Sequence, residues 1–252
     1  ALTALSGILA GAPTEGAVCI GSSGAETVAL VELYTSEGCD SCPPADRWLS
    51  ALGPRGFAPD RVVPIALHVD YWDYIGWRDR FADGRFSARQ RESVRRGGGR
   101  VVYTPQVLLD GRDFRPWNDA AALTQALGRI AAKPAQARLT LNAAEKSGTW
   151  SIRLEGRTVP RKGRAMAYLA IYENGLETEV RAGENAGARL RHGYVVRDWG
   201  GPVAADAEGR FLLARDLKRS GIAFARAGIA AFVEDPDTGE VLQALALDFC
   251  PG

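Results

Sequence analysis

The chain has 252 residues, of which 46% are hydrophobic and 24% charged, close to the average of globular proteins. These proportions exclude collagen-like, coiled-coil and wholly disordered chains. The 31 basic and 30 acidic residues nearly cancel, so we expect no nucleic-acid partner. No run of 18 apolar residues occurs, so we also expect no membrane span.

The first residues have the character of an export signal. Residues 1–12 are apolar and uncharged and end in the small residues Ala10-Gly11-Ala12, which resemble the end of a secretory signal peptide. An ordinary N-terminal tail or short helix is the alternative. The small, polar residues that follow favour a loop. We therefore expect residues 1–26 to be a signal remnant and leader loop, and the protein to be periplasmic or secreted.

The cysteines fit export to an oxidising compartment. Cys19 precedes the first expected strand, and Cys250 is third from the end. We predict a Cys19–Cys250 disulfide, which would close a very long loop and contribute about 4–5 kcal/mol in the chain-entropy description. The alternative is two unrelated buried thiols.

Residues 27–134 alternate between strand and helix patterns. Apolar runs predict strands, apolar residues at helical spacing predict helices, and Asp110-Gly111 predicts a tight hairpin turn. We expect Asn118 to cap the last helix of this part. The predicted order is β-α-β-α-β-β-α, over strand 28–34, a helix from Cys42 to Leu52, strand 61–68, helix 86–96, strand 106–109, strand 112–114 and helix 119–132.

After Lys133-Pro134 the pattern changes to short strands separated by turns. We expect strands at 137–141, 149–154, 165–172, 194–199, 229–233 and 241–247. This spacing favours a β-rich, sandwich-like C-terminal domain, residues 135–252, after an α/β domain, residues 27–134.

Cys39-Asp-Ser-Cys42 is the motif with chemical potential. When the second cysteine of such a pair opens a helix, the first lies beside the positive helix end, which stabilises the reactive thiolate. Cys39 would attack a partner disulfide, and Cys42 would resolve the mixed disulfide and form a Cys39–Cys42 bond. The pair alone is weak evidence, since half of a zinc site looks the same.

The element order, the cysteine pair and Thr104-Pro105 resemble the thioredoxin fold. More narrowly, segments 35–46, 68–73 and 103–106 resemble the DUF1223 family of exported thioredoxin-like proteins, as do 181–185 and 194–197. The resemblance implies that Pro105 is a cis-proline beside the disulfide and that Thr104 and Pro105 guide a substrate chain. It implies no established activity, because the family's function is unassigned.

Two features differ from thioredoxins. Pro43 and Pro44 follow the second cysteine, and the carboxylates of Glu37 and Asp40 oppose ionisation of Cys39. We therefore expect a Cys39 pKa well above that of the strongest periplasmic oxidants. Such a pair would act as a reductant or isomerase-like exchanger, or only structurally.

An aromatic loop at 69–77 follows the second strand and is expected to flank the cysteines. Tyr71 and Trp72 would receive a peptide or small substrate; the alternative is that the loop's aromatic residues seal a small core. His68 is a candidate for proton transfer, with a hydrogen-bonded structural role as the stronger alternative.

Two further chemistries stay open. Cys39, Cys42, His68 and Asp70 offer ligands for zinc or copper, and Cys39 with His68 offers a hydrolase-type pair that lacks an identifiable orienting group.

The predicted function is thiol–disulfide exchange outside the cytoplasm, with a protein or small-molecule thiol or disulfide as partner and no cofactor. The alternatives are a non-catalytic binding or structural protein with a stapling disulfide, and a metal-binding protein. An attacking sulfur has to be reachable, so we expect an exposed Cys39 sulfur if the pair is catalytic.

Overall fold

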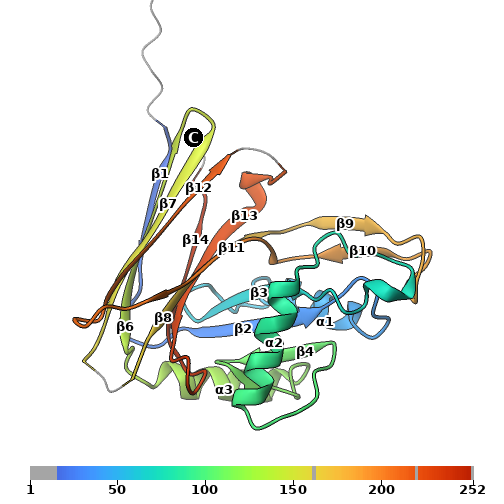
Figure 1. Ribbon diagram of the computed structural model, residues 1–252, viewed down its shortest axis with the longest axis horizontal. Coiled ribbons are helices and arrows are strands. Elements are labelled where there is room, and N and C mark those ends of the chain that lie inside the picture. The colour runs from blue at the N-terminus through green and yellow to red at the C-terminus, as the bar shows by residue number, and fades with distance from the viewer. Residues whose placement is uncertain (1–15, 161–162, 219–220, 251–252) are drawn as a thin grey trace, which may run out of the picture.

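The computed structural model describes residues 16–160, 163–218 and 221–250. In this part the chain is β-rich, and a mixed sheet of eight strands runs through its centre (Figure 1). In spatial order these strands are β14 (Val241–Asp248), β13 (Ala227–Glu234), β8 (Met166–Glu173), β11 (Val195–Ala204), β3 (Val62–His68), β2 (Ala29–Thr35), β4 (Gln106–Leu109) and β5 (Arg112–Asp113). Strand β3 pairs in parallel with β2 and β11, and the other pairs are antiparallel.

Two smaller sheets accompany the central one. The four-stranded antiparallel sheet has the order β1 (Val18–Ser22), β6 (Ala137–Lys146), β7 (Thr149–Thr158) and β12 (Arg210–Lys218). Strands β9 (Leu176–Glu179) and β10 (Arg189–His192) form a separate antiparallel ribbon. We call residues 176–192 the arm; Figure 1 shows it extending away from the four-stranded sheet, on the side of α1.

The α-helices of the described residues are α1 (Pro43–Ser50), α2 (Gly84–Arg96) and α3 (Ala120–Ala131), and the short 3-10 helices are η1 (Asp73–Ile75) and η2 (Phe224–Arg226). None of them is long and apolar enough to cross a membrane. The cap of α3 is Asp119 and not Asn118, because Asp119 Oδ1 accepts hydrogen bonds from the Ala121 and Ala122 amides.

The central sheet is covered on both faces, which explains its continuous apolar strands. Alternate side chains of one strand enter different cores: Leu30 lies in a cluster with Phe86 of α2, whereas Val31 lies in a cluster with Leu49 of α1 and Leu127 of α3. Helix α2 therefore covers one face, and α1 and α3 cover the other.

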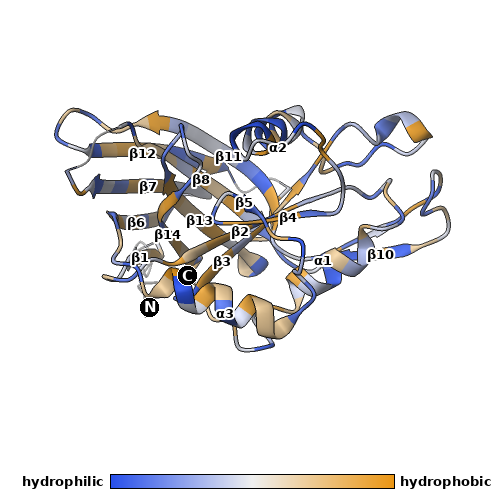
Figure 2. Ribbon diagram, turned by 90° about the horizontal axis from the view of Figure 1, so that it is seen from below, coloured by the Kyte–Doolittle hydropathy of each residue, from blue (hydrophilic) through white to orange (hydrophobic). Residues whose placement is uncertain are grey.

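The four-stranded sheet packs against the C-terminal strands of the central sheet. Their shared core contains Trp150, Phe224 and Phe249 together with Ile229 of β13. Figure 2 shows largely hydrophobic strands in the central sheet and a largely hydrophilic α2, whose few buried positions suffice to seat it on the sheet.

The predicted element order is found up to α3, while the C-terminal strands are shared between sheets. Strands β6, β7 and β12 build the four-stranded sheet, but β8, β11, β13 and β14 extend the central sheet. The link is the pairing of β11 with β3, in which Val195 lies opposite Ala66. The predicted boundary at residue 134 thus falls between segments that contribute strands to one sheet.

Several strands of the structure were not predicted. The predicted leader loop contains a strand, β1, which pairs with β6 over Val18 to Ser22. Strands β9, β10 and β12 were not predicted, and β10 contains His192. The predicted signal-like segment, residues 1–12, lies outside the described residues.

Candidate functional site

The loop between β2 and α1 carries the cysteine pair. We call residues 36–42 the cysteine loop. Cys39 and Cys42 form a disulfide with their Cα atoms 5.4 Å apart, and Cys42 is the N-cap of α1. Amides within the loop bond locally, from Cys39 to the Ser36 carbonyl and from Cys42 to the Cys39 carbonyl. The predicted Cys39–Cys42 bond is confirmed, as is the Cys19–Cys250 bond.

Helix α1 offers this pair few amide hydrogens. Pro43 and Pro44 occupy its first positions and have no N–H group. The next amides, of Ala45 and Asp46, already donate to the Cys42 carbonyl. Stabilisation of a Cys39 thiolate at this helix end would therefore rest on the helix dipole more than on direct hydrogen bonds.

The Thr104–Pro105 segment lies beside the cysteine loop. Strand β4 pairs antiparallel with β2, and Gln106 lies opposite Tyr34, so Pro105 faces the end of β2 from which the loop starts. The Thr104–Pro105 peptide bond is cis, which confirms that prediction. The indole Nε1 of Trp72 donates to Thr104 Oγ1 at 2.7 Å.

Both cysteines are buried. Cys39 and Cys42 are each 0% exposed, whereas Asp40 and Ser41 between them are exposed. The expectation of an exposed attacking sulfur is therefore wrong for this conformation. Trp72 and Ile75 pack against the same loop, since a Cβ atom added to Gly38 would lie 3.2 Å from an atom of each.

The arm holds the cysteine loop by its backbone. The side-chain amide of Asn185 donates to the Glu37 carbonyl at 2.8 Å and to the Cys39 carbonyl at 2.9 Å. The Glu184 carboxylate accepts a hydrogen bond from the Asp40 amide at 3.2 Å. A segment far along the sequence thus binds the backbone of the loop that carries the cysteine pair.

A cluster of buried polar side chains lies next to the loop. His68 Nδ1 is 2.6 Å from Asp79 Oδ2, and the same oxygen accepts the Glu37 amide. The Glu37 carboxylate is also fully buried and accepts a hydrogen bond from Trp77 Nε1 at 2.9 Å. His68 is therefore held by a hydrogen bond, as the structural alternative for this residue predicted. No described contact joins it to a cysteine sulfur.

His192 of the arm completes this cluster. Its Nε2 is 3.4 Å from Glu37 Oε1 and its Nδ1 is 3.8 Å from Asp46 Oδ2. The His192 and His68 rings meet edge to face with centroids 5.1 Å apart. Neither nitrogen of His192, nor Nε2 of His68, has a hydrogen-bond partner among the described residues.

Burial and charge shift the ionisation of this cluster. Burial raises the pKa of Asp46, although the nearby histidines oppose the shift. Burial alone would lower the pKa of His68, but the Asp79 carboxylate, together with those of Asp46 and Glu37, outweighs burial and the pKa is raised. The pKa of Asp79 is lowered because His68 and its hydrogen bonds outweigh burial. Each of these two shifts favours the charged form of its group.

The predicted substrate residues of the aromatic loop are held by the protein itself. Tyr71 donates from its hydroxyl to Gln90 of α2 at 3.0 Å, and Trp72 bonds Thr104 as described above. Both side chains are half-buried. This arrangement agrees with the sealing alternative and leaves a substrate role for Tyr71, Trp72, Thr104 and Pro105 as a prediction.

The described residues are not arranged for either of the two alternative chemistries, metal binding and hydrolase-type catalysis. Among the described residues, no three His, Cys, Asp or Glu side chains are arranged to hold a metal ion. The Cys39 and Cys42 sulfurs are bonded to each other, and Asp70 accepts a hydrogen bond from Ser87 of α2. In the hydrolase-type alternative Asp79 would orient His68, but no described hydrogen bond joins His68 to Cys39.

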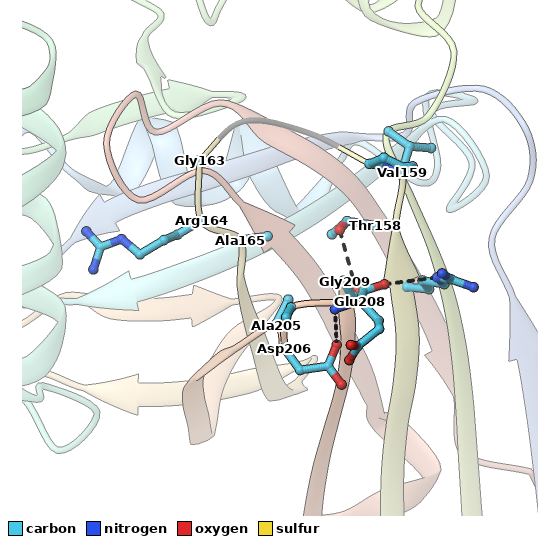
Figure 3. Close-up of a pocket in the computed structure, with 12 residues that line it drawn as sticks. Thr158, Val159, Gly163, Arg164, Ala165, Ala205, Asp206, Glu208 and Gly209 are labelled. Carbon is cyan, nitrogen blue, oxygen red and sulfur yellow. Dashed lines mark hydrogen bonds between the residues drawn. The ribbon is translucent and has the colours of Figure 1, made fainter.

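A pocket of about 500 Å³ lies in another part of the molecule (Figure 3). It is lined by segments 157–160, 163–165 and 205–209, around the turns that follow β7 and β11. None of these segments contains a predicted site residue, so the pocket and the cysteine pair are separate features.

Sequence reasoning missed the residues that enclose the pair. Asn185 and Glu184 lie within the segment 181–185 that carried the family resemblance, but no chemistry was assigned to them. Asp46, Asp79 and His192 gave no recognisable spacing, because they come from a helix, a loop and a distant strand. Only the fold brings them together.

The fold and site define a β-rich protein in which a buried Cys-x-x-Cys disulfide opens a helix beside a cis-proline. Residues 30–234 match the family described as protein of unknown function (DUF1223), and the chain belongs to this family. No match was found among the curated proteins.

Two solved structures are similar. Protein AGR_C_4864 from Agrobacterium tumefaciens is 26% identical, with a TM-score of 0.64, over 89% of this chain and 96% of that one. HBP35 of Porphyromonas gingivalis is 15% identical, with a TM-score of 0.66, over 90% of this chain and 76% of that one. The second likeness concerns the fold alone.

Proposed function

We propose that the protein is an extracytoplasmic thiol–disulfide exchange protein that acts through Cys39 and Cys42. The observation that carries the proposal is the placement of the disulfide, which spans the loop between β2 and the start of α1, opposite the cis Thr104–Pro105 segment. This is the arrangement that the resemblance to thioredoxin-like proteins implies for an exchange site. Two disulfides in one chain support an oxidising compartment.

The exchange proceeds in two balanced steps. The thiolate of reduced Cys39 attacks a partner disulfide, a Cys39–partner bond forms, and one partner sulfur leaves as a thiolate. The Cys42 thiolate then attacks the Cys39 sulfur, restores the Cys39–Cys42 bond and releases the second partner sulfur. Two electrons pass from the cysteine pair to the partner, and the reverse sequence oxidises a partner dithiol.

The surroundings of Cys39 favour a reducing or isomerase-like pair. Pro43 and Pro44 remove two amide donors from the helix start, and the buried carboxylates of Glu37 and Asp46 oppose a nearby negative sulfur. A thiolate without strong stabilisation leaves the disulfide comparatively hard to reduce. We therefore expect a Cys39 pKa well above that of strongly oxidising pairs, which lies at about 3.5.

A second candidate function has its own supporting observation. The complete burial of Cys39 and Cys42 favours a structural disulfide that fastens the cysteine loop to α1. In that case the protein binds or supports a partner without exchange.

Equilibration with glutathione buffers separates the two candidates. Exchange predicts that the wild type follows a reversible two-electron couple. It also predicts that Cys42→Ser accumulates a Cys39–glutathione disulfide, because the resolving thiol is missing, and that Cys39→Ser accumulates less of one. A disulfide that resists glutathione until urea unfolds the protein would reject exchange and leave the structural role.

A further inference from the structure

We propose that the arm is a lid over the cysteine pair and that Asn185 is its latch. The inference rests on the proposed function, because a buried disulfide cannot exchange with a partner unless a covering element moves. The closed conformation is the one described above, with both cysteines 0% exposed.

The latch is a set of polar contacts at the tip of the arm. One side-chain amide, that of Asn185, satisfies two backbone carbonyls of the cysteine loop, and the neighbouring Glu184 accepts from the Asp40 amide. Asp40 is exposed, so water can replace Glu184 at the Asp40 amide when the tip lifts. The Glu37 and Cys39 carbonyls belong to fully buried residues, so the loss of the Asn185 donors is the larger cost of opening.

The arm is the covering element best placed to move as a unit. Its two strands pair only with each other, apart from both larger sheets. At its two ends Gly175 and Tyr194 have φ values of +65° and +57°. Asn174 Oδ1 accepts the Tyr194 amide and joins these ends. Such element-terminal positions are where hinge motions concentrate.

The inner face of the arm explains why it closes again. Val180 and Leu190 are buried, and the His192 ring enters the polar cluster beside Glu37 and Asp46. Gly183 has its Cα so close to Ile75 and Trp77 that an added Cβ would lie 3.2–3.3 Å from their atoms. The closed state is thus held by packing, and removal of the latch shifts the balance without removing the lid.

The test measures access to the disulfide. Tris(2-carboxyethyl)phosphine reduces disulfides to thiols, and alkylation followed by peptide mass spectrometry reports the Cys39–Cys42 bond separately from Cys19–Cys250. Two variants open the latch: Asn185→Ala deletes its donors, and Asn185→Asp places a carboxylate opposite two carbonyls. Asn142→Ala is the matched control, a half-buried asparagine in β6 of the four-stranded sheet.

We expect both Asn185 variants to lose the Cys39–Cys42 bond about tenfold faster than the wild type, since two modest hydrogen bonds hold the closed state. Asn142→Ala is expected to react at the wild-type rate. Each rate is measured across low urea concentrations, where lid opening predicts a much weaker urea dependence than global unfolding.

Two results would contradict the lid proposal. One is reduction of the Cys39–Cys42 bond at the same rate in Asn185→Ala and in the wild type. The other is a wild-type reduction rate that depends on urea as strongly as global unfolding does. Failure of the lid differs from failure of exchange. If the Asn185 variants react faster but no form equilibrates with glutathione, the lid stands and exchange fails. If the wild type equilibrates with glutathione while the Asn185 variants react no faster, exchange stands and the lid fails.

Discussion

His68 Nδ1 lies 2.6 Å from Asp79 Oδ2, with both side chains withdrawn from solvent. Asp79 also accepts hydrogen bonds from the amides of Glu37 and Phe81. This carboxylate therefore connects the end of β3 to the cysteine loop and to its own loop.

Replacement of Asp79 by asparagine is expected to destabilise the protein by about 3–5 kcal/mol, because it removes the carboxylate that pairs with the fully buried His68. Urea unfolding followed by fluorescence measures the loss. Arg153→Ala is the control, since Arg153 and Glu155 form an exposed pair that is worth less than about 1 kcal/mol. An Asp79→Asn variant as stable as the control would contradict the prediction.

The carboxyl group of Asp110 predicts a pH dependence of stability. Burial raises the pKa of Asp110 to about 7, although its Oδ1 accepts the Leu30 amide. The folded chain therefore binds more protons than the unfolded chain between about pH 4 and pH 7, and the free energy of unfolding falls as pH rises through this window. The effect is about 1.4 kcal/mol for each pKa unit of difference.

Asp110→Asn is expected to flatten this slope, so that the variant gains stability relative to the wild type on going from pH 4 to pH 8. His68 also makes the free energy of unfolding fall as pH rises. Its stabilising contribution is full below about pH 6.5 and is lost as pH rises through its raised pKa. Both proteins contain His68, so its contribution drops out when the free energy of unfolding of the wild type is subtracted from that of Asp110→Asn. Parallel pH profiles of the two proteins would argue against a buried titrating Asp110.

The turn after β4 has no space for a side chain. Gly111 has a φ of +72°, and an added Cβ would lie 2.0 Å from the Gly239 carbonyl oxygen. Gly56 has a similar φ of +89° with no atom within 4 Å of such a Cβ. Gly56→Ala is expected to cost about 1 kcal/mol from backbone strain alone.

Gly111→Ala is expected to cost at least about 3 kcal/mol, because backbone atoms at two distant turns must separate. Thermal unfolding of the two variants side by side gives the comparison. Equal losses would mean that the contact between Gly111 and Gly239 relaxes freely.

Arg89 of α2 joins the two halves of the central sheet. Its guanidinium contacts Glu32 of β2 at 2.6 Å and Glu234 of β13 at 2.7 Å, and all three side chains are at most 8% exposed. Arg89→Ala is expected to cost about 3–5 kcal/mol, since buried Glu32 loses its ion pair and buried Glu234 is left with Arg96 alone among the described cations.

Arg89→Lys is expected to lose less than Arg89→Ala, because an ammonium group keeps the charge but cannot span both carboxylates with a fixed fork. Arg85→Ala, at a more exposed pair with Asp83, is the control and is expected to cost less than about 1 kcal/mol. Calorimetry of all three variants ranks their losses of stability. A loss in Arg89→Ala no larger than that in Arg85→Ala would refute the bridging role.

The fold could be predicted from the sequence where local residue patterns define an element. The fully buried β2 and β3 appear as continuous apolar runs, and the proline pair marks the start of α1. The tight turn at Asp110 and Gly111 was visible from two residues. The assignment of the C-terminal strands to two different sheets could not be predicted from the sequence. The alternation of apolar and polar residues along a strand shows which face is buried, but not which strand pairs with it.

The site was readable only in part, for the same reason. The cysteines and Pro105 were recognisable from the motif and the family resemblance. The contact of the arm with the cysteine loop depends on Asn185, whose side-chain amide reaches backbone carbonyls that any residue type would supply. Sequence carries no mark of such a contact, so the burial of the sulfurs could only be learned from the fold.

The Cys19–Cys250 bond fastens β1 of the four-stranded sheet to the segment that follows β14 of the central sheet. Nearly the whole described chain is therefore a covalent ring. A protease that cuts one exposed turn inside the ring yields a nicked molecule whose pieces stay attached, and they separate on a denaturing gel only after reduction.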